Sequence, residues 1–349
     1  MADSDVPMMS LAVTLQELPA QLGEIFYFVV LPVLLLATIG WALQRRLGLD
    51  MPTLTRLNFH FVVPGMIYFM VVSSPVSAAD VGTVMGFAAA VMAGQMALTY
   101  VAAIVRRVPK DQRSALMMST IFNNSGNYGL PLQEMAFRPL GAAFQARAAN
   151  LQVFYMLFQN IGNFTLGVLL AARGHRRATW GETVGHVLRF PPLWALAAAI
   201  LTVLLRSRLT PDEVSETVEA LQPFVDVLAY VKGAFIALAV CTLGAQLATV
   251  KREGPKYPVT LSVVLRLLTG PALGLGVIYL FGLEGLTAQV LLIGTSTPTA
   301  VNCMLLCLEF DNHPDFAARA VFYSTVLSPV TVTLTVFLAR SGLLPGFAL

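Results

Sequence analysis

The chain has 349 residues, of which 56% are hydrophobic and only 12% charged, and its formal net charge is +3. Soluble domains carry about 25% charged residues, so this composition excludes an ordinary soluble protein. It indicates a polytopic membrane protein, because each span of a bilayer needs about 20 predominantly apolar residues.

Ten apolar stretches follow one another along the chain with short connections between them. The apolar pattern sets their expected bounds to within a few residues. These bounds are 25–43, 53–74, 80–105, 113–137, 143–172, 185–205, 223–248, 257–281, 287–308 and 317–340. We therefore expect an all-α membrane protein with ten transmembrane helices. Residues 1–24 form an N-terminal segment without the basic stretch and cleavage site of a signal peptide.

Lysine and arginine are divided unevenly between the two sides of the expected spans. Most of them follow spans one, three, five and seven. The opposite side carries only Arg138, Arg147, Arg206, Arg208 and Arg340. Because cytoplasmic loops are enriched in these residues, we expect both termini to lie outside, in the periplasm of a bacterium. This asymmetry accounts for the basic loops without a nucleic-acid partner.

Two halves of the chain show signs of an internal repeat. Val153-Phe154-Tyr155 in span five recurs as Val321-Phe322-Tyr323 in span ten, and the preceding spans are both interrupted. We expect a first five-helix repeat over 25–174. The connection 175–222 begins the second repeat with span six (about 185–205), and 223–349 completes it. Five is odd, so the second repeat is inverted. Inverted repeats with broken helices are typical of transporters.

Span four contains helix breakers and side-chain amides in an otherwise apolar setting. The stretch IFNNSGNYGLPL covers residues 121–132. Pro131 removes a backbone donor, and Gly126 and Gly129 relax the backbone. Freed backbone groups must be buried in protein or line a wet cavity. The stretch therefore predicts an opened helix near the middle of the membrane.

Span nine has a counterpart in STPTAVN, residues 296–302, with Pro298 as the breaker. Two opened helices that cross would bring half-helix N-termini together, and these suit a carboxylate. The alternative is a pair of structural kinks. Breaks at equivalent places in both halves favour a binding site. The candidate substrate-binding residues are Asn123, Asn124, Asn127, Tyr128, Thr297, Asn302 and Lys232, and the helix-breaking residues are Gly126, Gly129, Pro131 and Pro298.

Ionisable residues inside spans are candidates for function by default. Lys232 is interpreted as a counter-charge for a carboxylate or as a side chain that reaches the membrane surface. Arg266 binds an anion or pairs with a carboxylate such as Glu134 or Asp226. His60 suits proton coupling by its ordinary pKa, or serves only in packing. Glu134 is a weaker candidate for a proton relay.

Other polar residues in the spans admit simpler interpretations. Gln159, Asn160 and Asn163 follow helical spacing and are expected to face the interior of the bundle. Cys303 and Cys307 share a helix face, but no third soft ligand lies nearby, so small packing residues are favoured over a metal pair. We expect no metal and no cofactor. The sequence lacks the HExxH, GxSxG and Walker A patterns, which argues against an enzyme.

The stretch IFNNSGNYGLPL closely resembles the fourth-span motif of the auxin efflux carrier family, which includes bacterial organic-acid carriers and the plant PIN-formed auxin exporters. The similarity extends over essentially the whole chain. Further matching stretches are NFHFVVPGMIY at 58–68 with Pro64, RLLTGP at 266–271, STPTAVN at 296–302 and FYSTVLSPVT at 322–331. The short connection between spans five and six resembles the bacterial members. A proline expected in the seventh span is replaced by Lys232-Gly233-Ala234.

The resemblance implies ten spans in two inverted repeats, crossing broken helices four and nine, a scaffold and a mobile transport domain, and a homodimer. It implies export or exchange of small carboxylates, such as malonate or malate in bacteria or auxin in plants. The expected location is the bacterial inner membrane. One alternative is a non-transporting membrane sensor of a metabolite. Another is a cation-coupled carrier of the bile-acid type, which sodium dependence would favour.

Overall fold

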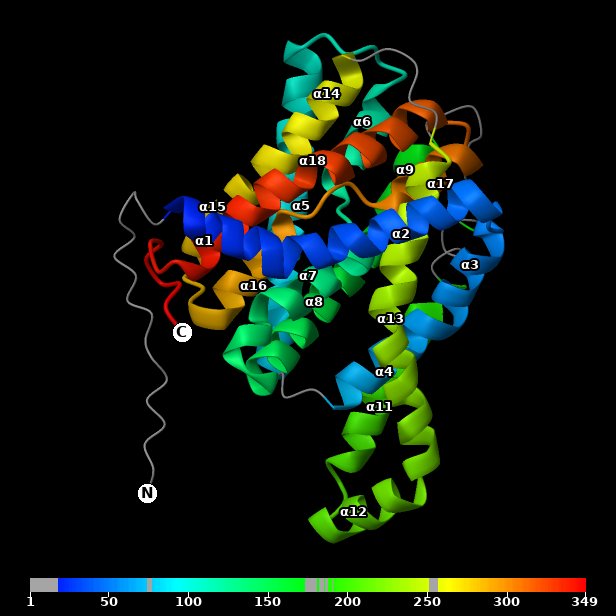
Figure 1. The fold of residues 1–349 in the computed structure, drawn as a ribbon, viewed down its shortest axis with the longest axis vertical. Coiled ribbons are helices and arrows are strands. Elements are labelled where there is room, and N and C mark those ends of the chain that lie inside the picture. The colour runs from blue at the N-terminus through cyan, green and yellow to red at the C-terminus, as the bar shows by residue number, and fades with distance from the viewer. Residues whose placement is uncertain are drawn as a thin grey trace.

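The computed structural model describes residues 18–73, 77–172, 181, 185, 188–189, 191–250 and 257–349. Within these ranges the regular elements are helices, and the β-contact between Asn123 and Thr299 is an isolated bridge. Figure 1 shows the helices as a bundle from which α11 and α12 project at one end. The predicted N-terminal segment 1–24 and connection 175–222 lie partly outside the described residues.

The first half of the chain supplies the elements up to α9. They are α1 (Leu18–Ile25), η1 (Phe26–Val30), α2 (Leu31–Leu47), α3 (Met51–Leu57), η2 (Asn58–Val62), α4 (Val63–Val72), α5 (Ala78–Val105), α6 (Arg113–Ile121), η3 (Ser125–Gly129), α7 (Leu130–Phe137), η4 (Arg138–Leu140), α8 (Ala142–Gly162), η5 (Asn163–Gly167) and α9 (Val168–Ala171). Here η4 is a 3-10 turn, and the other η elements are π-helical turns.

The second half supplies the remaining elements. They are α11 (Pro191–Arg206), α12 (Pro211–Ala220), α13 (Gln222–Ala248), α14 (Tyr257–Val264), η6 (Leu265–Thr269), α15 (Gly270–Phe281), α16 (Gly285–Thr295), α17 (Val301–Glu309) and α18 (Pro314–Arg340). The sequence-based bounds agree with these to within a few residues except at two starts. The first helical stretch begins at Leu18 rather than at 25, and α11 of span six begins at Pro191 rather than at 185.

Seven helical stretches in the described part of the chain are long and apolar enough to cross a membrane. They are Leu18–Leu47, Met51–Val72, Ala78–Val105, Ala142–Ala171, Gln222–Ala248, Tyr257–Phe281 and Pro314–Arg340. Two shorter apolar helices are Pro191–Arg206 and Gly285–Thr295. The predicted spans 113–137 and 287–308 are each divided into two helices. The chain is thus an integral membrane protein, and the helices are interrupted in the two spans in which the sequence predicted a break.

Four of the five π-helical turns in the described residues precede a helix that carries a proline in its first turn. The pairs are η1 before Pro32, η2 before Pro64, η3 before Pro131 and η6 before Pro271. Proline has no N–H and its ring crowds the preceding turn, so the helix widens locally to keep the other bonds. The proline-containing motifs of the sequence therefore mark places where the helices are locally irregular.

One group of helices consists of α2, α4, α11 and α13, which pack on one another, together with η2, which contacts α4, α11 and α13. Figure 1 shows α2 crossing α13. Small residues permit this approach: a Cβ added at Gly40 would lie 2.0 Å from the Cys241 carbonyl oxygen, and one at Gly244 would lie 1.8 Å from that of Ala37. Close backbone contact through small residues is the usual way in which membrane helices associate.

A second group surrounds the broken helices. It contains α5 to α9 and α14 to α18, with α8 packed against α5, α7 and α16, and α18 packed against α14, α16 and α17. Its buried apolar side chains belong to two clusters, one around Phe87, Tyr155 and Leu291 and the other around Met118, Phe122 and Cys303. The interrupted segments lie within this second group and contact α13 of the first through η3.

Candidate functional site

The two broken helices meet at their interruptions, which we call the crossing: residues 122–124 and 296–300. Asn123 and Thr299 form an antiparallel β-bridge there. The Asn124 N–H donates to the Pro298 carbonyl over 2.7 Å, and the Ala300 N–H donates to the Phe122 carbonyl over 3.0 Å. The crossing of broken helices expected from the sequence is therefore present, and backbone hydrogen bonds join the two segments.

Hydroxyl side chains satisfy the carbonyls at the end of α16. Thr295, Ser296 and Thr297 donate to the carbonyls of Leu292, Ile293 and Gly294 over 2.6, 2.7 and 2.9 Å. All three are fully buried. The last carbonyls of a helix have no partner in their own ladder, so these hydroxyls complete the helix end. Thr297, a predicted substrate-binding residue, thus uses its hydroxyl within its own turn.

Asn123 ties the crossing to α8. Its amide nitrogen donates to the Tyr155 hydroxyl over 2.9 Å and to the Gly294 carbonyl over 3.2 Å. Its amide oxygen is buried and has no hydrogen-bond partner among the described residues. Buried polar atoms are normally paired, so this oxygen is available to a ligand or water. Asn123 therefore holds the crossing in place and keeps one acceptor open.

Two glutamines extend this hydrogen-bond network from η3 to α7 and α16. The Gln152 amide donates to the Ser125 carbonyl over 2.8 Å. The Gln133 amide donates to the Gln152 amide oxygen over 3.2 Å and to the Val290 carbonyl over 2.8 Å. These bonds link η3, α7, α8 and α16. Side-chain amides thus take up backbone groups that the irregular segments leave without helical partners.

A small cavity lies at the crossing, with a volume of about 30 Å³, the size of one water molecule. Its polar wall presents the side chains of Asn124, Asn127, Asn160 and Asn302. Phe59, Val63 and Phe235 of the first helix group close it from the other side. The full lining is Phe59, Val63, Asn123, Asn124, Ser125, Gly126, Asn127, Met156, Asn160, Phe235, Ala300, Val301 and Asn302.

Two helical N-termini begin at the wall of this cavity. The run from Ser125 to Phe137 starts there as η3 and continues into α7, and α17 starts at Val301. Each N-terminus carries roughly half a positive elementary charge, and two together amount to roughly one. Backbone N–H groups at such ends bind anionic groups. The cavity therefore combines amides with positive potential, without a charged side chain in its lining.

The structure brings some predicted site residues together and separates others. Asn123, Asn124, Asn127 and Asn302 line the cavity, and Asn160 joins them, 3.4 Å from Asn302 through their side chains. Asn160 faces the interior as its helical spacing indicated. Gly126 also lines the cavity, while Gly129 packs against Gln152 and Thr297.

Tyr128 is buried and lies outside the cavity lining, although its neighbours Asn127 and Gly126 line it. Ser328 of α18 donates to the Tyr128 hydroxyl over 3.2 Å. A side chain at 128 points away from one at 127 by about a quarter turn of a helix, and this places it against α18. Tyr128 therefore contacts the protein interior rather than the cavity.

Lys232 and Glu134 form an ion pair, with the Lys232 Nζ 3.6 Å from the Glu134 Oε1. The Glu134 side chain is 12% exposed and that of Lys232 is 38% exposed. The pair joins α13 to α7, one helical turn along α13 from Phe235 in the cavity wall. Lys232 is thus near the cavity but not in its lining.

Arg266 has other partners than the carboxylates considered from the sequence. It donates to the carbonyls of Thr120 and Thr295, at the ends of α6 and α16. Glu134 is paired with Lys232 instead, and Asp226 accepts a bond of 2.8 Å from the Gln222 amide. The prediction that Arg266 pairs with one of these carboxylates is therefore wrong. The guanidinium binds backbone carbonyls at the ends of two helices instead.

His60 lies on the exposed side of η2, where its Nδ1 is 3.1 Å from the Arg56 carbonyl of its own helix. Cys303 donates to the Met118 carbonyl over 3.2 Å, and the Cys307 Sγ lies 3.9 Å from the Met118 Sδ. Among the described residues no group of three or more His, Cys, Asp or Glu side chains is arranged to hold a metal ion. Cys303 and Cys307 pack within the protein.

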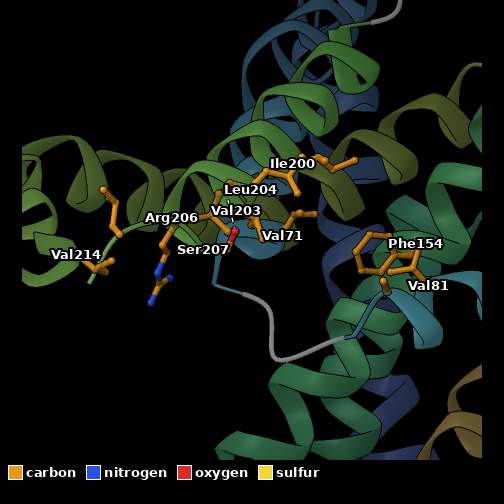
Figure 2. A pocket seen from close by; sticks show the side chains of 12 residues that line it. Val71, Val81, Phe154, Ile200, Val203, Leu204, Arg206, Ser207 and Val214 are labelled. Atoms are coloured by element: carbon orange, nitrogen blue, oxygen red, sulfur yellow. Dashed lines mark hydrogen bonds between the residues drawn. The ribbon is translucent and has the colours of Figure 1, made fainter. Parts of the chain in front are cut away.

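A larger cavity, of about 890 Å³, lies between the ends of α4 and α11 on one side and α5 and α8 on the other. Figure 2 shows Val71, Val203 and Leu204 on one wall, with Val81 and Phe154 across from them. Arg206 is the charged residue of its lining. Val63 of the small cavity and Val71 of the large one lie on the same helix, eight residues or about 12 Å apart.

Comparisons with known proteins point to membrane transport. The family model described as membrane transport protein matches residues 176–336. A protein of Methanothermobacter thermautotrophicus described as an uncharacterized transporter is 27% identical over 321 residues. That match covers 87% of this chain and 95% of the archaeal protein. These findings confirm the resemblance to the auxin efflux carrier family and support a secondary transporter embedded in the membrane.

Proposed function

We propose that this membrane transport protein carries small organic anions, with a carboxylate bound at the crossing of the broken helices. The observation that carries the proposal is the cavity in which two helical N-termini and several asparagine side chains converge. Amide donors and the partial positive charge of helix ends bind a carboxylate without a permanent countercharge. Asn124, Asn127 and Asn302 would contact the anion.

The size of the cavity supports a mechanism of alternating access. A space of about 30 Å³ accommodates one carboxylate oxygen or a water molecule, but not a whole organic acid. Phe59, Val63 and Phe235 would have to move away from the broken helices for the substrate to enter. These residues belong to the first helix group, which we propose as the scaffold, and the second group would move relative to it.

The larger cavity would serve as the approach to the site from one side of the membrane. It follows the same α4–α8 boundary as the small cavity, and Arg206 lies at its polar end. With both termini outside, as the distribution of basic residues indicates, this approach would open to the periplasm of a bacterial inner membrane. The further elements of the proposal are two inverted five-helix repeats, an export or exchange mode and a homodimer.

Flux of labelled acids into proteoliposomes tests the proposal. The panel would contain malonate, malate and indole-3-acetate, each measured with and without a pH gradient. We expect saturable uptake of at least one acid, and its loss in Asn127→Asp, because the new carboxylate repels an anion while conserving side-chain volume. Arg147→Gln, which changes an exposed ion pair with Asp80, is the control that should retain uptake.

Binding without flux would instead identify a sensor. Saturable binding of one of these acids to the purified protein, with no uptake under any gradient, would contradict transport and favour a membrane protein that detects a metabolite. Uptake that requires sodium would favour the cation-coupled alternative. Asn127→Asp should remove binding in either case, so that the location of the site is tested separately from transport.

A further inference from the structure

The interrupted helices present two kinds of ends at the crossing. The N-termini of η3–α7 and α17 line the small cavity, whereas α6 and α16 arrive with their C-termini. A helix C-terminus carries roughly half a negative elementary charge on its last carbonyls. In transporters built on broken helices, such carbonyls commonly coordinate the coupling cation.

Arg266 occupies the C-terminal ends in this protein. Its Nη1 donates to the Thr120 carbonyl over 2.9 Å, and its Nη2 donates to the Thr295 carbonyl over 2.5 Å. Thr120 lies in the last turn of α6 and Thr295 is the last residue of α16. One guanidinium thus bridges the ends of both half-helices, as a metal ion with carbonyl ligands would.

The site is shaped to hold this side chain. Arg266 is only 1% exposed, and it lies on the π-helical turn η6, directly before Gly270. A Cβ at Gly270 would lie 2.2 Å from the Arg266 Nη2 and 2.8 Å from the Thr295 carbonyl oxygen. Only glycine leaves room for the guanidinium between the two helices at this point. The RLLTGP stretch therefore supplies both the cation and the space for it.

The charges at the crossing balance without a metal ion. Arg266 is the buried charged side chain that contacts these helix ends, and no Asp or Glu side chain among the described residues is buried. Two C-terminal ends contribute roughly one negative charge in sum, which the guanidinium matches. A second cation at the same carbonyls would meet an uncompensated positive charge in a medium of low dielectric constant, where repulsion is strong.

We propose that Arg266 is a built-in cation that takes the place of a coupling metal ion at the crossing, so that anion transport by this protein requires neither sodium nor another metal cation. The inference rests on the proposed transport function and defines how it is driven. Arg266 would stay in place throughout the cycle and keep the ends of α6 and α16 together, while the N-terminal ends bind the substrate.

Transport and stability measurements on the unmodified protein test this directly. Uptake of the transported acid should change by less than about twofold when choline replaces sodium or potassium on both sides of the membrane. Thermal unfolding of the purified protein should likewise be insensitive to the choice of cation, because a bound ion would raise the midpoint. The unfolding measurement needs no flux, so a failure of the transport proposal would be recognised separately. Uptake or a melting midpoint that depends on sodium would overturn the inference.

Chemical rescue tests the role of the guanidinium. Arg266→Ala should lose uptake at least tenfold, and low millimolar guanidinium chloride should restore part of it, whereas sodium chloride should not. Arg340→Ala is the matched control, because Arg340 donates to the Ala136 carbonyl near the end of α7, away from the crossing. If Arg266→Ala keeps normal uptake, or if sodium restores it as well as guanidinium does, the inference is wrong. If Arg266→Ala does not fold, the inference is tested by uptake in Arg266→Lys and by the cation dependence of the unmodified protein.

Discussion

Asn123 and Thr299 face each other in an antiparallel bridge at the point where both of their helices are interrupted. Backbone bonds on either side of the bridge fix the two segments, and the Thr299 hydroxyl donates to the Ser119 carbonyl over 2.7 Å. The backbone polar groups at the crossing are thus largely satisfied by the protein. Side chains that remain open towards the cavity are therefore the ones expected to contact a solute.

Asn127 and Asn123 are predicted to respond differently to alanine. Asn127 is half-buried in the cavity wall, and its side chain makes no hydrogen bond with the described residues. A hydrogen bond to a charged carboxylate is worth ~1.5–3 kcal/mol, so Asn127→Ala should raise the half-saturating substrate concentration about tenfold or more. Its melting midpoint should stay close to that of the unmodified protein. Uptake and thermal unfolding measure the two effects.

Asn123→Ala should affect stability more than substrate affinity. It removes the donor to the Tyr155 hydroxyl and the Gly294 carbonyl, both of which are buried. The Gly294 carbonyl keeps its bond from the Thr297 hydroxyl, and the Tyr155 hydroxyl keeps one from the Gln159 amide. The variant therefore loses two hydrogen bonds of ~0.5–1.5 kcal/mol each, and we expect a clear fall in the melting midpoint. Equal losses of stability in Asn127→Ala and Asn123→Ala would contradict the distinction between a ligand-facing and a structural amide.

Gly129 is predicted to be a position where a methyl group is not tolerated. A Cβ there would lie 2.6 Å from the Gln152 Nε2 and 3.3 Å from the Thr297 Cγ2. Gln152 would have to leave the Ser125 carbonyl, and overpacking of this kind costs ~1–3 kcal/mol. Gly129→Ala should therefore lower the melting midpoint of the purified protein. Gly276→Ala is the control, since a Cβ there meets nothing within 4 Å. An equal midpoint in both variants would argue against close packing at Gly129.

The approximate bounds of most helices and both interruptions could be predicted from the sequence. Apolar length defines a span, and Pro131 and Pro298 disturb a helix through local chemistry that needs no knowledge of the partners. The pairing of Asn123 with Thr299 is different in kind, because the two lie far apart along the chain. It depends on how the helices pack, which the local pattern does not specify.

The roles of individual polar side chains were harder to predict for the same reason. Tyr128 lies among cavity residues in the sequence, but its ring direction places its hydroxyl against Ser328. Arg266 was expected to bind an anion or to pair with a carboxylate of the protein. The partners that it meets are backbone carbonyls, which carry no signal in the sequence. Phe235 lines the cavity, yet a phenylalanine in an apolar span looks like any packing residue.

Tyr128→Phe is predicted to leave substrate affinity unchanged. The substitution keeps the buried ring and removes only the hydroxyl that accepts from Ser328, which also donates to the Thr325 carbonyl over 2.9 Å. A net hydrogen bond contributes ~0.5–1.5 kcal/mol, so the melting midpoint should fall slightly. The half-saturating concentration in uptake should stay within about twofold. A tenfold rise in that concentration would show that Tyr128 contacts the substrate after all.

We predict that Lys232 and Glu134 are energetically coupled, so that replacing either one alone destabilises the protein more than replacing both. In Lys232→Met the Glu134 side chain, only 12% exposed, loses the cation 3.6 Å away. Breaking a buried ion pair costs ~3–5 kcal/mol, and the partial exposure of Lys232 should reduce that cost. Lys232→Met and Glu134→Met should each lower the melting midpoint more than the double variant does, because the double variant leaves no unpaired charge.

A double-mutant cycle measures this coupling and separates it from the role of Lys232 as a countercharge for the substrate. Arg147 and Asp80 form the control pair, at 3.5 Å but with side chains 45% and 25% exposed, and we expect a smaller coupling there. If Lys232 attracts the carboxylate, the double variant regains stability but still needs more substrate for half-saturation. If the double variant regains both, the ion pair only joins α13 to α7, and Lys232 has no part in binding.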